Sequence, residues 1–168
     1  NEANGHGGQD GNQDASWNCG TEGDDELTPE ILQLRTRQAK NLFALLLLSA
    51  GTPMFRMGDE FLQTQLGNNN PYNQDNETSW LNWERREQFN DFHHFCRQLI
   101  AFRKSHASLC RNTFWHDAIR WYGTDHAPDL AADSHCLAFC LHGIQEDPFD
   151  LYVMINADSQ MRKFGIYE

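Results

Sequence analysis

The chain has 168 residues, the ordinary size of a single domain. Its 13 Lys and Arg residues against 24 Asp and Glu residues give a formal charge of -11, which argues against nucleic acid or an anionic membrane surface as a partner. The longest apolar run, residues 42–50, is far shorter than the roughly 20 residues that a membrane-spanning helix needs.

The five cysteines are an odd number and include no Cys-x-x-Cys pair, which argues against both a disulfide framework and a zinc ribbon. If Cys136 and Cys140 share a strand, their Cα atoms lie about 13 Å apart. A disulfide needs roughly 4.4–6.8 Å between Cα atoms. Because no signal-peptide pattern opens the chain either, we expect reduced thiols and a cytoplasmic location.

Residues 1–27 are polar, contain no Lys or Arg, and are expected to form a long loop. A helix is predicted over residues 28–50, with Thr28 as its N-cap, Pro29 in its first position and Gly51 as its stop. The second half of this helix is apolar nearly all round, so we expect it to be buried on several sides.

After this helix, residues 52–57 are predicted to form a short strand that ends at Gly58–Glu60. A second polar loop, residues 61–83, comes next. A second helix is predicted over residues 86–104, since its apolar positions recur at helical spacing and form one buried stripe: Phe89, Phe92, Phe95, Cys96, Leu99, Ile100 and Phe102.

From Thr113 onward, four short runs separated by polar turns predict a meander of strands. These runs are residues 118–122, 136–142, 151–157 and 162–167. The chain opens without Met and stops within the last run, so we expect it to continue at both ends.

The predicted fold class is α/β plus all-β. Residues 1–110 are expected to form the C-terminal end of a (β/α)8 TIM-type barrel, with a long loop, a helix, the last strand, a cleft loop and the last helix. Residues 111–168 are expected to form an incomplete antiparallel C-terminal β-sandwich domain.

Several segments resemble isoamylase-type debranching enzymes of the α-amylase superfamily, and they occur in that family's order. They are residues 1–5, 16–23, 51–54, 58–60 and 67–76, followed by residues 137–139 and 150–157 in the predicted strands. The block from Asn68 to Asn76 is the most specific of them. One departure lies at His6, where the family more often has Glu.

The resemblance implies a glycoside hydrolase that hydrolyses α-1,6 branch linkages in glycogen, amylopectin or limit dextrin. Retaining glycosidases use an Asp or Glu nucleophile and an acid about 5–5.5 Å apart. By analogy with the family, these carboxylates lie before residue 1, so no catalytic residue is assigned and the rest of the barrel is an expected partner. Two alternatives stay open: a non-catalytic isoamylase-like glucan-binding or assembly subunit, and another activity of the superfamily.

Four residues of the second loop are predicted to bind substrate: Asn69, Asn70, Tyr72 and Asp75. Glucose presents vicinal hydroxyls and an apolar ring face, which amides, carboxylates and aromatic rings can bind. A carboxylate gives the stronger hydrogen bond, so Asp75 is the first choice. The alternative is that this loop satisfies its own backbone through Asx-turns.

Four further side chains are weighed as possible binders. Asp59 and Glu60 are adjacent and point in different directions, and one of them is expected to anchor the neighbouring loop. Trp80 and Trp83 could stack on a sugar, but their spacing of three before a helix favours packing in the core.

No metal or other cofactor is predicted. Residues 10–21 imitate a calcium loop, but Ala15 stands where that loop needs Gly, and Thr21 where it needs Glu. His93 and His94 lack a partner at metal-ligand spacing.

Overall fold

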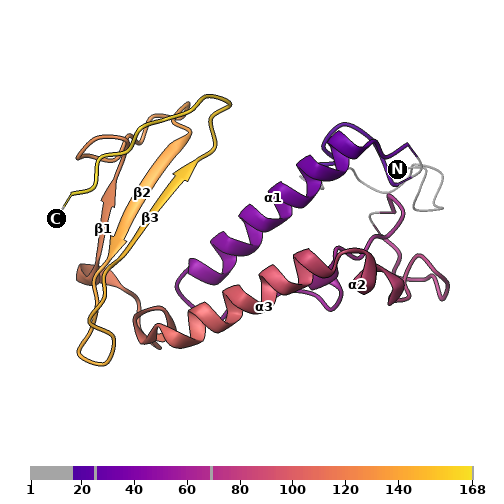
Figure 1. The fold of residues 1–168 in the computed structure, drawn as a ribbon, viewed down its shortest axis with the longest axis horizontal. Helices are drawn as coiled ribbons and strands as arrows, with labels where there is room; N and C mark the ends of the chain where they lie inside the picture. The colour runs from indigo at the N-terminus through magenta and orange to yellow at the C-terminus, as the bar shows by residue number, and fades with distance from the viewer. Residues whose placement is uncertain (1–16, 25, 69, 168) are drawn as a thin grey trace. The chain divides into compact units, whose positions relative to one another are not determined.

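The computed structural model describes residues 17–24, 26–68 and 70–167. The chain divides into two compact units, and each is described by itself. Unit 1 takes in the described residues up to Leu48 together with Pro53–Ala101, and unit 2 takes in Ser49–Thr52 and the described residues from Phe102 onward. Unit 1 is built of helices and loops, whereas unit 2 carries a small sheet (Figure 1). None of the helices in the described ranges is long and apolar enough to cross a membrane.

Helix α1, Pro29–Leu48, begins where the sequence predicts. The backbone N–H of Ile31 donates to Oγ1 of Thr28 at 3.4 Å, and the N–H of Leu32 donates to the Thr28 carbonyl at 2.9 Å. Thr28 therefore caps the first turn. A backbone hydrogen bond, followed by one from Thr28, lowers the pKa of Glu30 in this turn.

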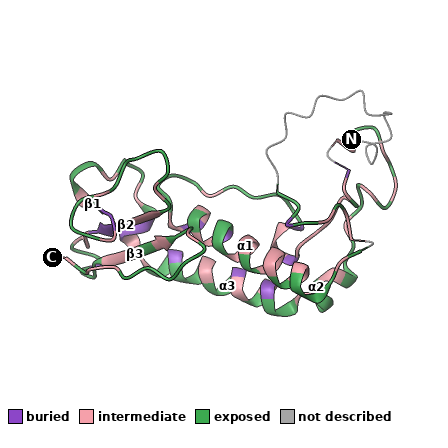
Figure 2. Ribbon diagram, turned by 90° about the horizontal axis from the view of Figure 1, so that it is seen from above, coloured by how far each residue is buried: buried purple, intermediate pink, exposed green. Residues whose placement is uncertain are grey.

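The expected burial of α1 on several sides is wrong for this structure. Phe43 and Leu47 are buried, whereas Leu42 is 67% exposed. The buried pair is spaced by four residues and therefore lies on one face, which packs against α3. Figure 2 shows buried positions along α1 and α3 beside exposed ones on the same helices. Within the described residues, therefore, only one face of the apolar second half of α1 is buried in a core.

The predicted helix over residues 86–104 is divided into α2, Glu84–Gln88, and α3, Asn90–Ser105. The division falls at Phe89, whose φ of -110° and ψ of 35° are not helical. The predicted apolar stripe is confirmed except at Phe102, which is 38% exposed, because Phe92 and Cys96 are buried against α1. Partly buried residues pack around this core: Ala39, Leu46, Leu62, Phe89, Phe95, Leu99 and Ile100.

The predicted strand at residues 52–57 is not present. Met54 and Met57 are 86% and 67% exposed, although the ring of Phe55 contacts that of Phe43 with 5.1 Å between centroids. A strand exists only when a neighbouring segment supplies backbone hydrogen bonds. No segment of the described residues forms a ladder with this one, so it stays irregular.

The sheet of unit 2 contains three antiparallel strands in the order β1-β2-β3. The strands are β1, Ile119–Tyr122, β2, Cys136–Leu141, and β3, Leu151–Asn156. They confirm three of the four predicted strands and the antiparallel meander. A core on one face contains Tyr122, Ala138 and Cys140, with Tyr152, Phe164 and Tyr167 packed against it.

The fourth predicted strand, residues 162–167, is wrong as a strand. This segment is held to the sheet by a backbone bond from Gly165 N–H to the Thr124 carbonyl at 3.0 Å and by Tyr152, whose hydroxyl donates to the Gly165 carbonyl at 3.0 Å. Its apolar side chains still pack on the sheet. The apolar spacing of residues 162–167 therefore correctly indicates that their side chains are buried. The Tyr152 hydroxyl, instead of a ladder of backbone hydrogen bonds, helps to hold this segment to the sheet.

Asp147 is a buried carboxylate that fixes the segment after α3. It is 5% exposed and accepts a hydrogen bond from Oγ of Ser108 at 2.8 Å. Nδ1 of His106 lies 3.2 Å from the same carboxylate oxygen. These contacts, the Ser108 hydroxyl first, lower the pKa of Asp147.

Arg103 is a buried charge whose bonds go to backbone carbonyls. It is 7% exposed and donates to the carbonyls of Ser49 at 2.9 Å and Gly51 at 2.7 Å. Both carbonyls belong to the short segment that follows α1. Arg103 therefore fixes the path of the chain as it leaves that helix.

Candidate functional site

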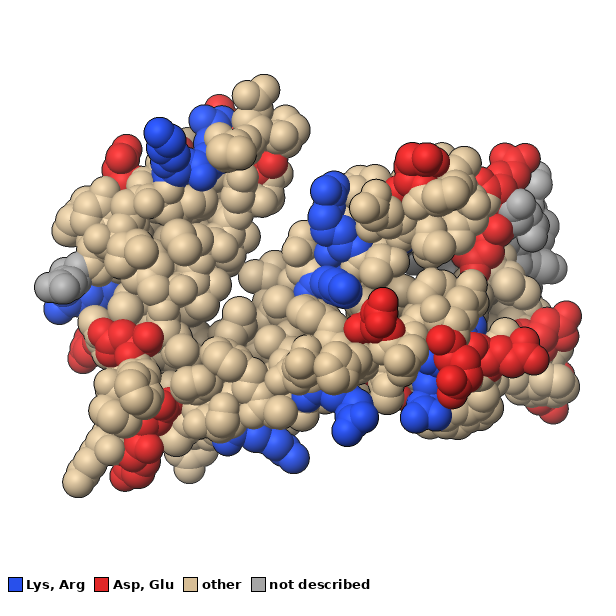
Figure 3. All heavy atoms as spheres, viewed as in Figure 1, with Lys and Arg blue, Asp and Glu red and all other residues tan. Residues whose placement is uncertain are grey.

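Asp24 ties the loop before α1 to two helices of unit 1. Its carboxylate accepts hydrogen bonds from Arg35 on α1 and from Arg85 on α2, both at 3.1 Å. Arg35 also donates to three backbone carbonyls within residues 18–23. On the face drawn in Figure 3, acidic side chains gather over the end of unit 1 that carries α2 and the loops.

A tight turn at Gly58 opens the second loop. Gly58 has a φ of 100°, which favours glycine, and the 3-10 helix η2, Asp59–Phe61, follows it. The Gly58 carbonyl accepts a hydrogen bond from the backbone N–H of Gln63 at 2.9 Å. A Cβ on Gly58 would lie 2.7 Å from Cβ of Gln63 and 2.8 Å from Cδ2 of Leu81. The turn therefore brings Gln63 close to the far limb of the loop.

Gln63 joins the two limbs of this loop. Its Nε2 donates to the Trp80 carbonyl at 2.9 Å, and its Oε1 accepts from the backbone N–H of Asn82 at 3.0 Å. The side chain of Asn82 in turn accepts from the backbone N–H of Glu84 at the start of α2 at 3.0 Å. The loop is thereby closed at its base by side-chain amides.

Trp80 stands on the second limb with most of its indole in solvent. Its side chain is held in place because Nε1 donates to Oδ1 of Asp75 at 2.7 Å, although the residue is 58% exposed. An exposed indole without such a bond samples several rotamers. Asp75 therefore fixes the orientation of an aromatic face.

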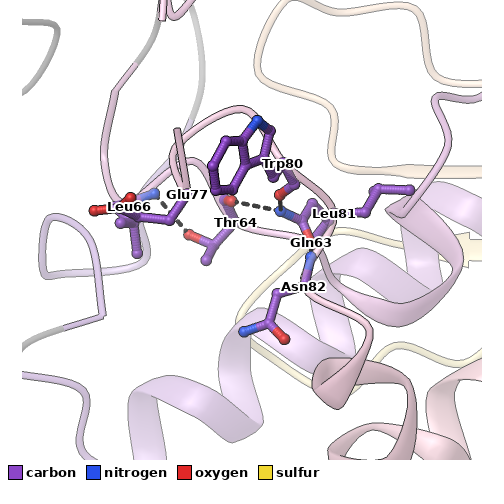
Figure 4. Close-up of a pocket in the computed structure, with 7 residues that line it drawn as sticks. All are labelled: Gln63, Thr64, Leu66, Glu77, Trp80, Leu81 and Asn82. Atoms are coloured by element: carbon purple, nitrogen blue, oxygen red, sulfur yellow. Dashed lines mark hydrogen bonds between the residues drawn. The ribbon is translucent and has the colours of Figure 1, made fainter. Parts of the chain in front are cut away.

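These side chains surround a cavity of about 390 Å³. Figure 4 shows Trp80 and Asn82 at its two ends with Gln63 between them. One aromatic face, two amides and a carboxylate suit a ligand that has an apolar ring face and several hydroxyls. The cavity is lined by Gln63, Thr64, Leu66, Glu77, Trp80, Leu81 and Asn82.

The four residues proposed from the sequence lie in or beside this loop, with different outcomes. Asn69 falls outside the described residues. Asn70, Tyr72 and Asp75 are described but do not line the cavity. Tyr72 is 79% exposed, and Asp75 meets the cavity wall through Trp80.

Part of the same loop satisfies its own backbone. The side-chain carbonyl of Asn68 accepts from the N–H of Asn70 at 2.9 Å, and that of Asn76 accepts from the N–H of Thr78 at 3.0 Å. Such Asx-turns are the alternative that the sequence left open. Asn68 is also buried, and its Nδ2 lacks a hydrogen-bond partner among the described residues.

Asp59 and Glu60 serve the turn that contains them. Asp59 accepts from the backbone N–H of Arg56 at 2.8 Å, and Glu60 accepts from the backbone N–H of Gly58 at 2.8 Å. The sequence predicted that one of the two carboxylates anchors the neighbouring loop, whereas in the structure both bind backbone N–H groups of the turn.

The interpretation of Trp80 and Trp83 as core residues is wrong for the described structure. Trp83 is 63% exposed, and its ring packs on Phe61 with 5.7 Å between centroids. Trp80 was considered as a stacking residue from the sequence but was assigned to the core. The run of polar residues just before it was the available signal, because a core strand or helix would carry apolar neighbours.

The five cysteines are free thiols in the structure. Burial, with the charge of Glu60 next, raises the pKa of Cys96 to about 12, so this thiol stays protonated and inert. Most of the calcium-like stretch, residues 10–16, lies outside the described residues. His93 and His94 belong to no metal-binding cluster in the part of the chain that the structure describes.

Comparison with curated proteins relates the chain to isoamylases and to glycogen operon proteins. Isoamylase 1 of Arabidopsis thaliana is 39% identical over 160 residues, which make up 93% of this chain and 20% of that protein. The glycogen operon protein GlgX homolog of Mycobacterium tuberculosis is 46% identical over 116 residues, or 68% of this chain and 16% of that protein. The chain is a homologue of one part of the isoamylases and GlgX proteins. No protein-family model matches it.

Solved structures agree with this assignment. The apo pullulanase of Paenibacillus barengoltzii matches this isoamylase homologue with a TM-score of 0.63 and 31% identity over 80% of the chain and 19% of the pullulanase. A mutant of the same pullulanase complexed with maltotetraose gives a TM-score of 0.61 and 32% identity over 79% of the chain and 20% of the mutant. The homologue therefore spans about a fifth of the length of the relatives that it matches.

Proposed function

We propose that this chain belongs to a debranching glycoside hydrolase that cleaves α-1,6-glucosidic branch linkages in glycogen or a related α-glucan. The names of its relatives support this proposal: isoamylases, GlgX and pullulanase. In the proposal, the catalytic nucleophile and acid lie in the rest of the longer protein, and this chain supplies part of the substrate cleft.

The proposal places residues 1–110 at the end of a (β/α)8 barrel and residues 111–168 in a C-terminal antiparallel β domain. Neighbouring barrel strands would give residues 52–57 the backbone ladder that they lack within the described chain. Neighbouring barrel helices and strands would cover Leu42, which is 67% exposed. Both differences from the sequence-based expectation are then explained by one arrangement.

The observation that carries the proposal is the fixed indole of Trp80 beside the side chains of Asn82 and Glu77. An aromatic face packs against the C–H groups of a glucose ring, and an amide and a carboxylate exchange hydrogen bonds with its hydroxyls. We propose Trp80 as a stacking residue and Asp75 as the residue that positions it. Asn69, Asn70 and Tyr72 remain proposed substrate contacts in the same loop.

Binding to linear malto-oligosaccharides tests the site without turnover, because these ligands contain no α-1,6 linkage. Using the whole protein that carries this chain, we expect Trp80→Ala to weaken maltohexaose binding about tenfold, which corresponds to about 1.4 kcal/mol. Trp83→Ala is the matched control, since Trp83 is equally exposed but does not line the cavity. Equal affinity losses in the two variants would remove Trp80 from the site.

Two substitutions separate the roles of Asp75. Asp75→Asn keeps an oxygen acceptor for the Trp80 indole but removes the charge, whereas Asp75→Ala removes both. A positioning role predicts near-normal binding for Asp75→Asn and weak binding for Asp75→Ala. A direct charged contact with sugar predicts that both lose affinity, by a factor of roughly ten or more for a bond of about 1.5–3 kcal/mol.

The reaction is tested by measuring reducing ends. The whole protein is expected to release them from glycogen or amylopectin but not from unbranched amylose, and the 168-residue chain alone is expected to release none. Hydrolysis by the isolated chain would refute the placement of the catalytic carboxylates. A whole protein that binds glucan without releasing reducing ends would instead support the non-catalytic subunit.

A further inference from the structure

The hairpin of β2 and β3 in unit 2 gathers three side chains of metal-binding type. Cys140 lies in β2, His142 follows the end of that strand, and Asp150 precedes β3. The register pairs Leu141 with Leu151, so His142 and Asp150 stand opposite each other one step further on. Cys140 shares the face of His142, because side chains two residues apart point to the same side of a strand.

The three side chains are close enough to share one ion. Nδ1 of His142 lies 3.0 Å from Oδ2 of Asp150, and Sγ of Cys140 lies 3.9 Å from the same oxygen. One ligand atom from each side chain lies within 4.8 Å of the others. Zinc bonds of 2.0–2.3 Å in a tetrahedron separate ligand atoms by about 3.3–3.8 Å. We propose that Cys140, His142 and Asp150 form a Zn²⁺ site.

The backbone around the three side chains is already held in place. The N–H of His142 donates to the Ala118 carbonyl at 2.8 Å, which continues the ladder to β1 beyond the end of β2. The N–H of Gly143 donates to Oδ1 of Asp150 at 2.8 Å, which leaves Oδ2 to face the other two groups. Small side-chain adjustments are therefore sufficient to complete the site.

The imidazole of His142 faces Asp150 through Nδ1, which is the ring nitrogen placed to bind the ion. Its Nε2 atom is buried and has no hydrogen-bond partner among the described residues. Buried ring nitrogens are usually paired, so this ring is incomplete in its present contacts. Either ring nitrogen can bind a metal, and the side chain of Asp150 is 54% exposed, so water can reach a fourth coordination position.

The donor set selects the class of metal. A thiolate and an imidazole favour zinc over magnesium and calcium, which take oxygen ligands. Burial, followed by the charge of Asp150, raises the pKa of Cys140, so Zn²⁺ must displace the thiol proton to solvent when the sulfur–zinc bond forms. The thiolate and the carboxylate of Asp150 together then balance the two charges of the ion.

Zinc binding to the reduced, chelator-treated whole protein that carries this chain tests the proposal. We expect one Zn²⁺ per chain, with Cys140→Ser and Asp150→Asn each weakening binding at least tenfold. Cys136→Ser is the matched control, because it removes a thiol from the same strand outside the cluster. Mg²⁺ and Ca²⁺ should not displace the zinc.

Cobalt gives a readout that does not depend on the variants folding. Co²⁺ added to the unsubstituted whole protein should produce a thiolate-to-cobalt charge-transfer absorption that Zn²⁺ abolishes. The absence of this absorption would overturn the proposal, as would zinc binding that Cys136→Ser weakens as much as Cys140→Ser does. Unchanged zinc affinity in a folded Asp150→Asn variant would remove Asp150 from the ligands and refute the three-ligand site.

Discussion

Replacing Gly58 by Ala should destabilise unit 1 through two separable effects. A φ of 100° is strained for any residue with a Cβ, at about 1–2 kcal/mol. The new Cβ would also lie 2.7 Å from Gln63 and 2.8 Å from Leu81, and such overpacking costs about 1–3 kcal/mol. Since Ala also restricts the unfolded chain by about 0.4–1 kcal/mol, the expected net loss is about 2–4 kcal/mol.

The matched control is Gly20→Ala in the same unit. Gly20 has a φ of 118°, but a Cβ there would meet its nearest atom, Cδ1 of Ile31, only at 4.0 Å. Its expected loss is therefore the backbone part alone, about 0.5–1.5 kcal/mol. Urea unfolding followed by far-UV circular dichroism measures both losses, with an unchanged m-value as the condition for comparison. Equal losses would refute the argument that the contacts with Gln63 and Leu81 exclude a side chain.

Three further predictions concern unit 2 and the thiols. The folded pKa of Asp147 is lowered, so its contribution to stability is present above the unfolded value of about 3.9 and is lost as the pH falls through the folded value. Ser108→Ala should therefore lower the melting temperature at neutral pH and make the melting temperature fall less as the pH is lowered. If the melting temperatures of the variant and the unsubstituted protein fall equally with pH, this reasoning is wrong. Iodoacetamide should label the exposed Cys110 first and the buried Cys96 only after unfolding, as read by mass spectrometry. Arg103→Met removes two bonds to carbonyls and should cost about 1.5–3 kcal/mol in urea unfolding; no measurable loss would show that water replaces it.

Features that depend on neighbouring residues were predicted well from the sequence. The start of α1 follows from Thr28 and Pro29, whose capping chemistry is local. The three strands of unit 2 follow from short runs of β-forming residues between polar turns. The break at Phe89 was not predictable, because the apolar spacing continues through it.

Features that depend on distant partners were not predicted correctly. Residues 52–57 have the composition of a strand, but a ladder needs a second segment at the right place. Leu42 is apolar, yet its exposure depends on which elements pack on α1. The last run, residues 162–167, buries its side chains without the ladder that its spacing suggested.

The candidate sites show the same limit. Trp80 gained its role from a bond to Asp75 five residues earlier, which no helical or strand period predicts. The group formed by Cys140, His142 and Asp150 required the hairpin register, since His142 and Asp150 are eight positions apart in the sequence. In both cases the sequence shows that residues of the right chemical type are present, but only the structure shows that they lie close together.

The side-chain amide of Gln63 closes the second loop at its base, which allows the loop to vary in length and sequence. Its bonds to Trp80 and Asn82 hold the two ends of the loop together, and Asp75 and Asn76 bind Trp80 from within the loop. Doubling the length of a flexible loop whose ends are fixed costs only about 0.6 kcal/mol in closure entropy. We therefore expect length changes within residues 64–79 that keep Asp75 and Asn76 to leave the start of α2 in place, so that ligand preference at this cavity changes while α2 does not.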